Sequence, residues 1–257
     1  MSIHPTAVIH PRARIAEDVE IGPYTIVGEH VTIGRGTKIA SHVVIEGWTT
    51  IGERNHIFPF SSVGTPPQDI GYRNEETYLL IGDDNVIREC ATIHRATTKE
   101  ERKTVIGNNN FLMAYSHVAH DSRLGNHITM ANSVALGGHI VIEDYAILGG
   151  MAAVHQFVRI GAYAIVGGLT GVGMDIPPYV TASGSRAQLY GLNLVGLKRR
   201  GFSDETISTL KKAYKIVFRS GMTLEEALKK VQTELGDSRE VAHLVDFIRN
   251  TKRGVTR

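Results

Sequence analysis

The sequence of 257 residues is poor in cysteine and tryptophan, with one residue of each, and it lacks a long apolar run. The single cysteine, Cys90, cannot form a disulfide within the chain, which fits a reducing compartment, and we assign its thiol no catalytic role. No apolar stretch approaches the roughly 18 residues that cross a bilayer. The first residues, MSIHPTAVIH, lack the charged and apolar regions of a secretory signal. We therefore expect a cytoplasmic protein without a membrane span.

Excess charge of either sign is also small, but its distribution along the chain is uneven. Residues 1–186 carry 14 Lys and Arg against 18 Asp and Glu, whereas residues 187–257 carry 14 against 8. A basic C-terminal quarter can bind nucleic acid, an anionic membrane surface or an acidic protein, or it can be a solvated helical surface.

Aliphatic residues recur every six positions through most of the chain, and this repeat predicts the fold. They occupy 26 positions in three runs, beginning at Ile3, Ile81 and Ile106. A period of six fits neither a helix of 3.6 residues per turn nor a hairpin meander. It fits short strands joined by tight turns, in which the repeat residue and the residue two before it point inward. Glycine often follows the repeat residue, and we expect it to ease the corner.

Three such hexads make one triangular coil, so residues 18 apart should stack about 4.8 Å apart, as in a parallel sheet. The sequence therefore predicts a parallel β-helix over residues 1–186. Segments near 64–80 and 94–105 break the period and are too polar for the core, so we expect them to loop out of the prism.

Beyond Pro177 and Pro178 the period becomes helical, which predicts a small α-helical domain over residues 187–257. Ser203 can cap a helix that stops at Gly221, and Thr223 with Glu226 forms a capping box for the next. Gly201 ends an earlier amphipathic segment, Gly236 ends the capping-box helix, and a last helix begins after Ser238.

Titratable side chains concentrate on one edge of the predicted coil. With a stacking period of 18, His120 lies under Gly138 and then Gln156, and Asp121 lies under His139. His155 directly precedes Gln156 and so lies one residue from the column that begins at His120. A cluster of titratable groups on one edge is a candidate site.

Two chemistries fit this cluster. In the first, neutral His120, with Asp121 as its partner, acts as a general base on a hydroxyl nucleophile. In the second, His117 and His120 with His139 or His155 bind zinc, as in a carbonic anhydrase. A structural solenoid is a third reading, although the two loops and the edge cluster count against it.

Several motifs together resemble the UDP-N-acetylglucosamine O-acyltransferases that begin lipid A biosynthesis. These are IRECATIHRAT, NFLMAYSHVAHD, LGGHI, GGMAAVHQF and GLKRRGFS, and the resemblance extends over essentially the whole chain. It implies that the β-helix is left-handed, that the protein is a homotrimer with sites between subunits, and that no metal or cofactor takes part. The implied reaction transfers an R-3-hydroxyacyl chain from acyl carrier protein to the 3-hydroxyl of UDP-N-acetylglucosamine. The implied partner is thus an acidic protein and not a nucleic acid.

The resemblance also assigns roles to residues. His120 matches the general base, Asp121 its partner, and the backbone N–H of Gly138 the donor to the thioester oxyanion. Gly168 matches the position that limits the acyl chain, and glycine there leaves the groove open for about fourteen carbons; the alternative is that Gly168 is only a corner glycine with positive φ. Residues that match contacts to the nucleotide sugar or the acyl-pantetheine arm are Gln68, Asp69, His117, His139, His155, Gln156, Asn193, Arg199 and Arg200.

A few positions depart from the family pattern. Gly71 stands where a lysine is frequent, Ala96 where a glycine is usual, Arg186 where a histidine is common and Val195 where a glutamate is common. These departures bear on sugar specificity, so acylation of a 3-amino analogue on nitrogen is the alternative reaction.

Overall fold

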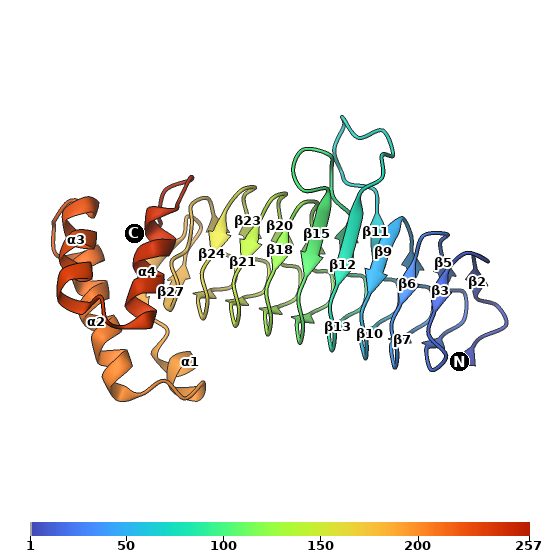
Figure 1. Ribbon diagram of the computed structural model, residues 1–257, viewed down its shortest axis with the longest axis horizontal. Coiled ribbons are helices and arrows are strands. Elements are labelled where there is room, and N and C mark those ends of the chain that lie inside the picture. Colours follow the sequence, from blue (N-terminus) through green and yellow to red (C-terminus); the bar gives the residue numbers. More distant parts are fainter. Residues whose placement is uncertain (1) are drawn as a thin grey trace.

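The computed structural model describes residues 2–257, which form a long triangular prism with helices at its C-terminal end (Figure 1). The chain runs around the prism from sheet A to sheet B to sheet C and back to sheet A. We call the corners between successive sheets the A–B, B–C and C–A edges. Within residues 2–257 no helix has the length and apolar character needed to cross a bilayer.

The strands of sheets A, B and C pair in parallel, because each coil places its strands directly on those of the coil before it. The exception is the last strand, which pairs antiparallel with the strand before it. Sheet A comprises β1 (Ser2–Ile3), β4 (Glu20–Ile21), β7 (Lys38–Ile39), β10 (His56–Ile57), β13 (Val86–Ile87), β16 (Phe111–Leu112), β19 (Thr129–Met130), β22 (Ile147–Leu148), β25 (Ile165–Val166), β27 (Val180–Ser183) and β28 (Gln188–Leu192). Sheet B comprises β2 (Val8–Ile9), β5 (Ile26–Val27), β8 (Val44–Ile45), β11 (Ser62–Thr65), β14 (Thr92–His94), β17 (His117–Val118), β20 (Ala135–Leu136), β23 (Ala153–Val154) and β26 (Gly171–Val172). Sheet C comprises β3 (Arg14–Ile15), β6 (Thr32–Ile33), β9 (Trp48–Ile51), β12 (Tyr78–Ile81), β15 (Lys103–Ile106), β18 (Arg123–Leu124), β21 (Val141–Ile142) and β24 (Arg159–Ile160).

The hexad repeat explains the core. Ile21 pairs with Ile39 of the next coil, and both side chains are buried. From Ile21 onward, the residue two positions before the repeat residue is also buried, as for Val19 and Thr37. The predicted stacking and inward alternation are therefore confirmed.

The glycines that follow repeat residues fit the corners through close packing and not through a positive φ. Gly22 and Gly161, which directly follow repeat residues, do not have positive φ. A Cβ on Gly22 would lie 2.7 Å from the carbonyl carbon of Ala40, and one on Gly161 would lie 2.3 Å from the nitrogen of Pro178. These glycines allow close approach of the next coil. Positive φ falls instead on later corner residues, most of which carry side chains.

Two loops leave the prism on one side, between β11 and β12 and between β14 and β15 (Figure 1). The first spans residues 66–77 and the second residues 95–102, slightly less than predicted, because β12 and β15 are each four residues long. We call them loop 1 and loop 2.

The helices are α1 (Leu194–Arg199), α2 (Asp204–Arg219), α3 (Leu224–Leu235) and α4 (Arg239–Arg249). Ser203 and Ser238 cap α2 and α4, and Thr223 with Glu226 forms the predicted capping box of α3. The domain boundary at residue 186 stays a prediction. The antiparallel pair β27 and β28 crosses it, and Val255 pairs with Asp175 at the end of the prism.

Candidate active site

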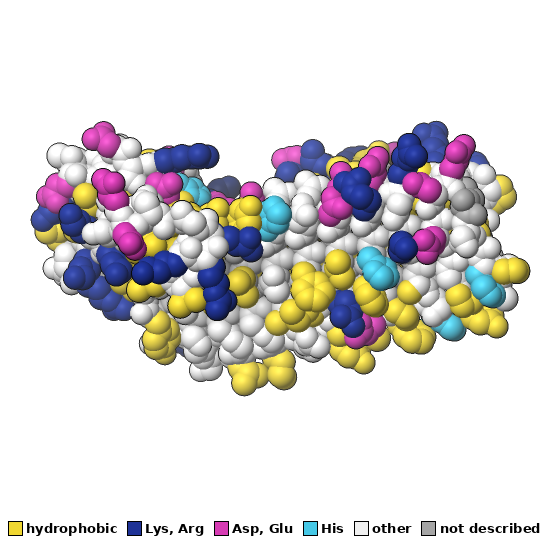
Figure 2. All heavy atoms as spheres, turned by 90° about the horizontal axis from the view of Figure 1, so that it is seen from below, with side chains coloured by type: hydrophobic (Ala, Val, Ile, Leu, Met, Phe, Trp, Pro, Cys, Tyr) yellow, Lys and Arg dark blue, Asp and Glu magenta, His cyan; other side chains and the backbone are white. Residues whose placement is uncertain are grey.

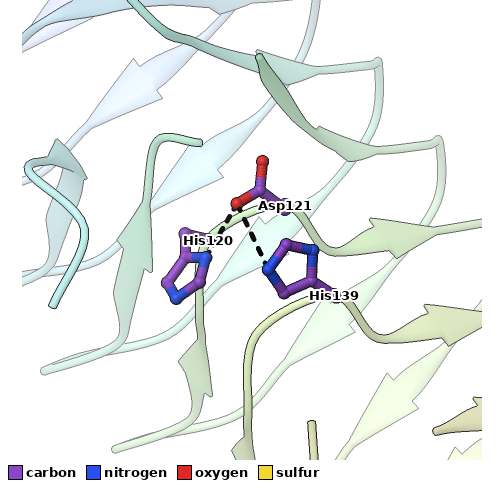
Figure 3. Close-up of side chains that lie close together, drawn as sticks. All are labelled: His120, Asp121 and His139. Carbon is purple, nitrogen blue, oxygen red and sulfur yellow. Dashed lines mark hydrogen bonds and ion pairs between the residues drawn. The ribbon is translucent and has the colours of Figure 1, made fainter. Parts of the chain in front are cut away.

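The central pair of the site, His120 and Asp121, lies at the B–C edge directly after β17. Nδ1 of His120 is 2.8 Å from Oδ2 of Asp121, so the carboxylate holds the Nδ1 edge of the imidazole ring (Figure 3). The His120 side chain is 15% exposed and that of Asp121 only 1%. The imidazole thus reaches the surface while its partner is covered, which suits a base that exchanges a proton with a bound substrate.

Asp121 is held by the start of loop 2. The hydroxyl and the backbone N–H of Thr97 donate to its Oδ2 at 2.7 and 3.1 Å, and the Asp121 N–H donates to Oγ1 of Thr104 at 2.9 Å. Burial raises the pKa of the Asp121 carboxyl, but the hydrogen bonds from His120 and Thr97 outweigh it, so the pKa lies below its ordinary value. Asp121 is therefore ionised at neutral pH.

His139 stands one coil further along the same edge. Its Nε2 is 3.8 Å from Oδ2 of Asp121 (Figure 3). Its ring stacks on Phe157 with centroids 4.4 Å apart. The carboxylate of Glu100 lies 3.1 Å from its Nδ1 but is not aligned for a hydrogen bond. His139 and His120 therefore flank the same carboxylate from successive coils.

Gly138 lies directly against the imidazole of His120. A Cβ at this position would be 2.6 Å from Cε1 and 2.9 Å from Nε2 of His120, closer than real side-chain contacts. No backbone or side-chain acceptor within residues 2–257 receives the Gly138 N–H. Glycine therefore makes room for the ring and leaves a backbone donor available beside it.

Two further histidines, His94 and His117, lie on sheet B beside the central pair. Nδ1 of His117 is 2.7 Å from the hydroxyl of Thr92, and its ring meets that of His94 edge-on at 4.8 Å. Burial lowers the pKa of His117, with a smaller contribution from His120. Burial, His117, His120 and Arg95 lower the pKa of His94 to about 4. Both rings are therefore predominantly neutral at pH 7.

The predicted loop residues are placed by a contact between the two loops. The ammonium of Lys99 in loop 2 pairs with the carboxylate of Asp69 in loop 1, and the Gly71 N–H donates to Asp69 at 2.8 Å. Lys99 and that N–H hold the pKa of Asp69 below its usual range, with His120 adding a small effect. Gln68 beside it is exposed.

His155 and Gln156 follow β23 on the same B–C edge and are exposed. His155 lines a groove of about 550 Å³ together with Met174 and Arg186. Gly168 lies instead at the A–B edge, where it is exposed. Its φ is not positive, whereas that of Leu169 is 56°. The reading of Gly168 as a corner glycine with positive φ is therefore wrong.

Comparison with known proteins supplies the family. The profile described as "Udp N-acetylglucosamine O-acyltransferase; Domain 2" matches residues 175–256, and the bacterial transferase hexapeptide profile matches residues 1–35. The acyl-[acyl-carrier-protein]--UDP-N-acetylglucosamine O-acyltransferase of Thermodesulfovibrio yellowstonii is 57% identical over 99% of both chains. That of Trichlorobacter lovleyi is 60% identical over the full length of both. The chain belongs to the UDP-N-acetylglucosamine O-acyltransferase family.

Solved structures of the family agree with the fold along the whole chain. LpxA from Acinetobacter baumannii superposes with a TM-score of 0.97 at 46% identity, covering 99% of both chains. The enzyme from Moraxella catarrhalis superposes with a TM-score of 0.95 at 45% identity over 100% of both. This likeness confirms the left-handed parallel β-helix with its C-terminal helices, an exception to the right-handed rule for parallel connections.

The residues of the C-terminal quarter that match substrate contacts of the family lie away from the B–C edge. Asn193 is buried and caps α1, with its side chain accepting from the Gly196 N–H at 2.9 Å and donating to the Tyr163 carbonyl at 2.9 Å. Arg199 is exposed. The guanidinium of Arg200 lies 4.6 Å from the ring centroid of Tyr145, at the C–A edge.

Within residues 2–257, one group of side chains has metal-ligand spacing: His120, Asp121 and His139, with ligand atoms within 4.8 Å of one another. This differs from the three-histidine set that the zinc hypothesis required. Oδ2 of Asp121 already faces His120 Nδ1 and two donors of Thr97. The donors around the carboxylate fit a hydrogen-bonded His–Asp pair better than a metal site.

Sequence reasoning missed the side chains that loop 2 brings to this acyltransferase site. Thr97, Lys99 and Glu100 contact Asp121, Asp69 and His139 respectively. The stacking rule of the coil gives no position for residues inserted between coils. An insertion between coils carries no periodicity from which these contacts could be predicted.

Proposed function

We propose that the protein transfers an R-3-hydroxyacyl chain from acyl carrier protein to the 3-hydroxyl of UDP-N-acetylglucosamine, in lipid A biosynthesis. Relatives with this named activity are similar over the full length of the chain. The observation that carries the chemistry is the pair of His120 and Asp121, 2.8 Å apart, with the imidazole partly open to solvent. Such a pair can activate a hydroxyl for acyl transfer.

The geometry supports a general-base mechanism. Because Nδ1 of His120 donates to the Asp121 carboxylate, Nε2 is the nitrogen left to accept a proton. We propose that Nε2 takes the proton of the sugar hydroxyl while its oxygen attacks the thioester carbonyl. The imidazolium then returns the proton to the departing pantetheine sulfur as the carbon–sulfur bond breaks.

Two neighbouring groups support the charges that develop. The Asp121 carboxylate stabilises the imidazolium that forms during attack, as carboxylates do in related His-dependent reactions. The Gly138 N–H lies beside the ring and donates to no other group within residues 2–257. We propose that it donates to the oxyanion of the tetrahedral intermediate, which stabilises the negative charge without reorganisation.

We also propose that the protein acts as a homotrimer. In one chain His120 lies on the B–C edge, Gly168 on the A–B edge and Arg200 against the C–A edge. Side chains on different edges of one prism point away from one another, so a shared site needs edges from neighbouring copies. The A–B edge also carries apolar side chains that are more than half exposed, which supports packing between copies: Tyr24, Phe60, Tyr115, Met151 and Leu169.

The proposed function is tested by mass spectrometry of the product formed from UDP-sugars and a series of acyl carrier protein thioesters. An ester on the 3-hydroxyl of UDP-N-acetylglucosamine is expected. Faster formation of an amide from a 3-amino analogue would favour the alternative acceptor. Absence of any acylated sugar, with metal-dependent hydration of carbon dioxide in its place, would contradict acyl transfer.

Charge reversal on α2 should weaken use of the thioester substrate. Lys211 and Lys212 are exposed on α2, and Lys and Arg gather on the helical end of the molecule (Figure 2). We propose that the acidic carrier protein docks there, an attraction that salt screens. Lys211→Glu with Lys212→Glu should raise KM for the acyl carrier protein thioester at least several-fold and flatten its salt dependence.

Reversal of Arg12 and Arg14, at the opposite end of the prism, is the matched control and should leave KM unchanged. An unchanged KM and salt dependence in the Lys211 and Lys212 variant would assign the basic helices another role.

Replacing Gly168 with methionine should shorten the preferred acyl chain. A Cβ at Gly168 would have the Gly150 carbonyl oxygen, at 3.2 Å, as its nearest contact, so the larger side chain fits with a small adjustment. Each methylene displaced from an apolar groove loses about 0.8 kcal/mol of burial. We expect the kcat/KM ratio of ten-carbon to fourteen-carbon substrates to rise at least about 10-fold. An equal loss on both substrates would mean only that the coil is damaged, and Gly168→Ala should give an intermediate ratio.

A further inference from the structure

The first three residues of loop 2, Arg95, Ala96 and Thr97, are buried at the B–C edge, and Thr97 is 2% exposed. Its hydroxyl donates to Oδ2 of Asp121 at 2.7 Å, and its backbone N–H donates to the same oxygen at 3.1 Å. The neighbouring Thr98 is exposed. Of these two adjacent threonines, Thr97 therefore carries the contact to the buried carboxylate.

The oxygen that Thr97 contacts is the one that orients His120. Oδ2 of Asp121 is also 2.8 Å from Nδ1 of the imidazole. A carboxylate that is 1% exposed has no bulk water to hold it, so its rotation about the Cβ–Cγ bond depends on protein donors. Thr97 supplies both a hydroxyl and an amide donor to it, one from the side chain and one from the backbone.

We propose that Thr97 is a positioning residue for acyl transfer, whose hydroxyl fixes the Asp121 carboxylate and through it the imidazole of His120. The inference rests on the proposed function, since it concerns the same proton transfer. It gives loop 2 a part in the reaction: the insertion that interrupts the coil completes the hydrogen-bond chain from Thr97 to Asp121 to His120.

Thr97 also has a local structural contact. Its Oγ1 accepts the Lys99 N–H at 3.2 Å, which shapes the turn that carries Lys99 toward Asp69. If shaping the turn were its only role, its loss would displace Lys99 and Asp69 and so raise KM for the nucleotide sugar. A positioning role changes kcat instead, because the Thr97 side chain is covered and its hydroxyl donates to Asp121.

The test compares Thr97→Val, Thr97→Ser and Thr98→Val by steady-state kinetics over a range of pH. Thr97→Val should lower kcat about 10- to 100-fold, the range of a lost hydrogen bond to a charged group, with both KM values within about 3-fold of wild type. Thr97→Ser should restore most of kcat, because serine keeps the hydroxyl. Thr98→Val, the matched control, should behave as wild type.

The pH profile gives a readout that a purely structural role would not move. Loss of the Thr97 hydroxyl leaves more negative charge on the Asp121 carboxylate, which favours the protonated form of the imidazole–carboxylate pair. The acid limb of kcat/KM should therefore shift upward by about half a pH unit in Thr97→Val and return in Thr97→Ser. If Thr97→Val folds poorly, Thr97→Ala, which also lacks the hydroxyl, replaces it with a shift expected in the same direction.

Three results would overturn the inference: wild-type kcat in Thr97→Val, a loss in Thr97→Ser as large as in Thr97→Val, or a raised KM with an unmoved acid limb. Each presupposes an active wild-type enzyme. A wild-type protein that forms no acylated sugar would instead overturn the proposed function, so the two failures are distinct.

Discussion

Alanine at His120 is expected to lower kcat by roughly 10²- to 10⁴-fold, the range typical of removing a positioned general base. The imidazole is the partly exposed member of a hydrogen-bonded pair whose other member, Asp121, is covered. Its removal leaves the pair's carboxylate without a group that can reach a substrate hydroxyl. Steady-state rates with acyl carrier protein thioester and UDP-N-acetylglucosamine measure the loss.

The control for this prediction is His56→Ala, which removes an exposed histidine from sheet A. Both variants should fold and sediment as wild type does, and His56→Ala should keep wild-type turnover. Turnover of His120→Ala within a few-fold of wild type would show that another group accepts the proton.

The second large effect is expected at Gly138, where alanine should lower kcat about 100-fold or more. The added Cβ would lie 2.6 Å from Cε1 of His120, so the ring must rotate or shift away from the acceptor position. Misplacement of a reacting group by about 1 Å can cost 10²-fold in rate. The methyl group also crowds the space beside the Gly138 N–H, which we propose as the oxyanion donor.

Gly28→Ala is the matched control, because Gly28 lies on the same edge near the N-terminus and a Cβ there would have its nearest contact at 3.2 Å. The thermal midpoints of both variants separate loss of chemistry from loss of folding. A Gly138→Ala enzyme that is folded and fully active would mean that His120 does not work from the position seen here.

Much of the fold could be predicted because its physical cause is local and repeated. A side chain that points inward at every sixth position defines a coil of three short strands, and buried residues such as Ile39 and Ile57 satisfy that rule. Helix ends are also encoded locally, since a serine or threonine can accept the free N–H groups of the first turn. Ser203 and Thr223 do so.

Part of the site followed from the same regularity. Stacking of successive coils placed His139 beside Asp121 and Gly138 beside His120, and the structure has both contacts. The rule identifies neighbours within the coil, although it does not give the direction of a ring or a carboxylate. The edge cluster suggested the general base at His120 with Asp121, the family resemblance assigned the other roles, and all of these roles remain proposals.

The tertiary structure decided what the repeat could not. The sequence by itself determined the coil, its loops, its helices and the column of histidines on one edge. Only the folded chain decided that Thr97 holds Asp121 and that Lys99 of loop 2 pairs with Asp69 of loop 1. It also decided that the positive φ values at the corners fall on residues such as Leu169 and not on Gly168. The physical reason is that contacts within the coil are fixed by a period, whereas contacts of inserted loops depend on side-chain hydrogen bonds and burial that no spacing encodes.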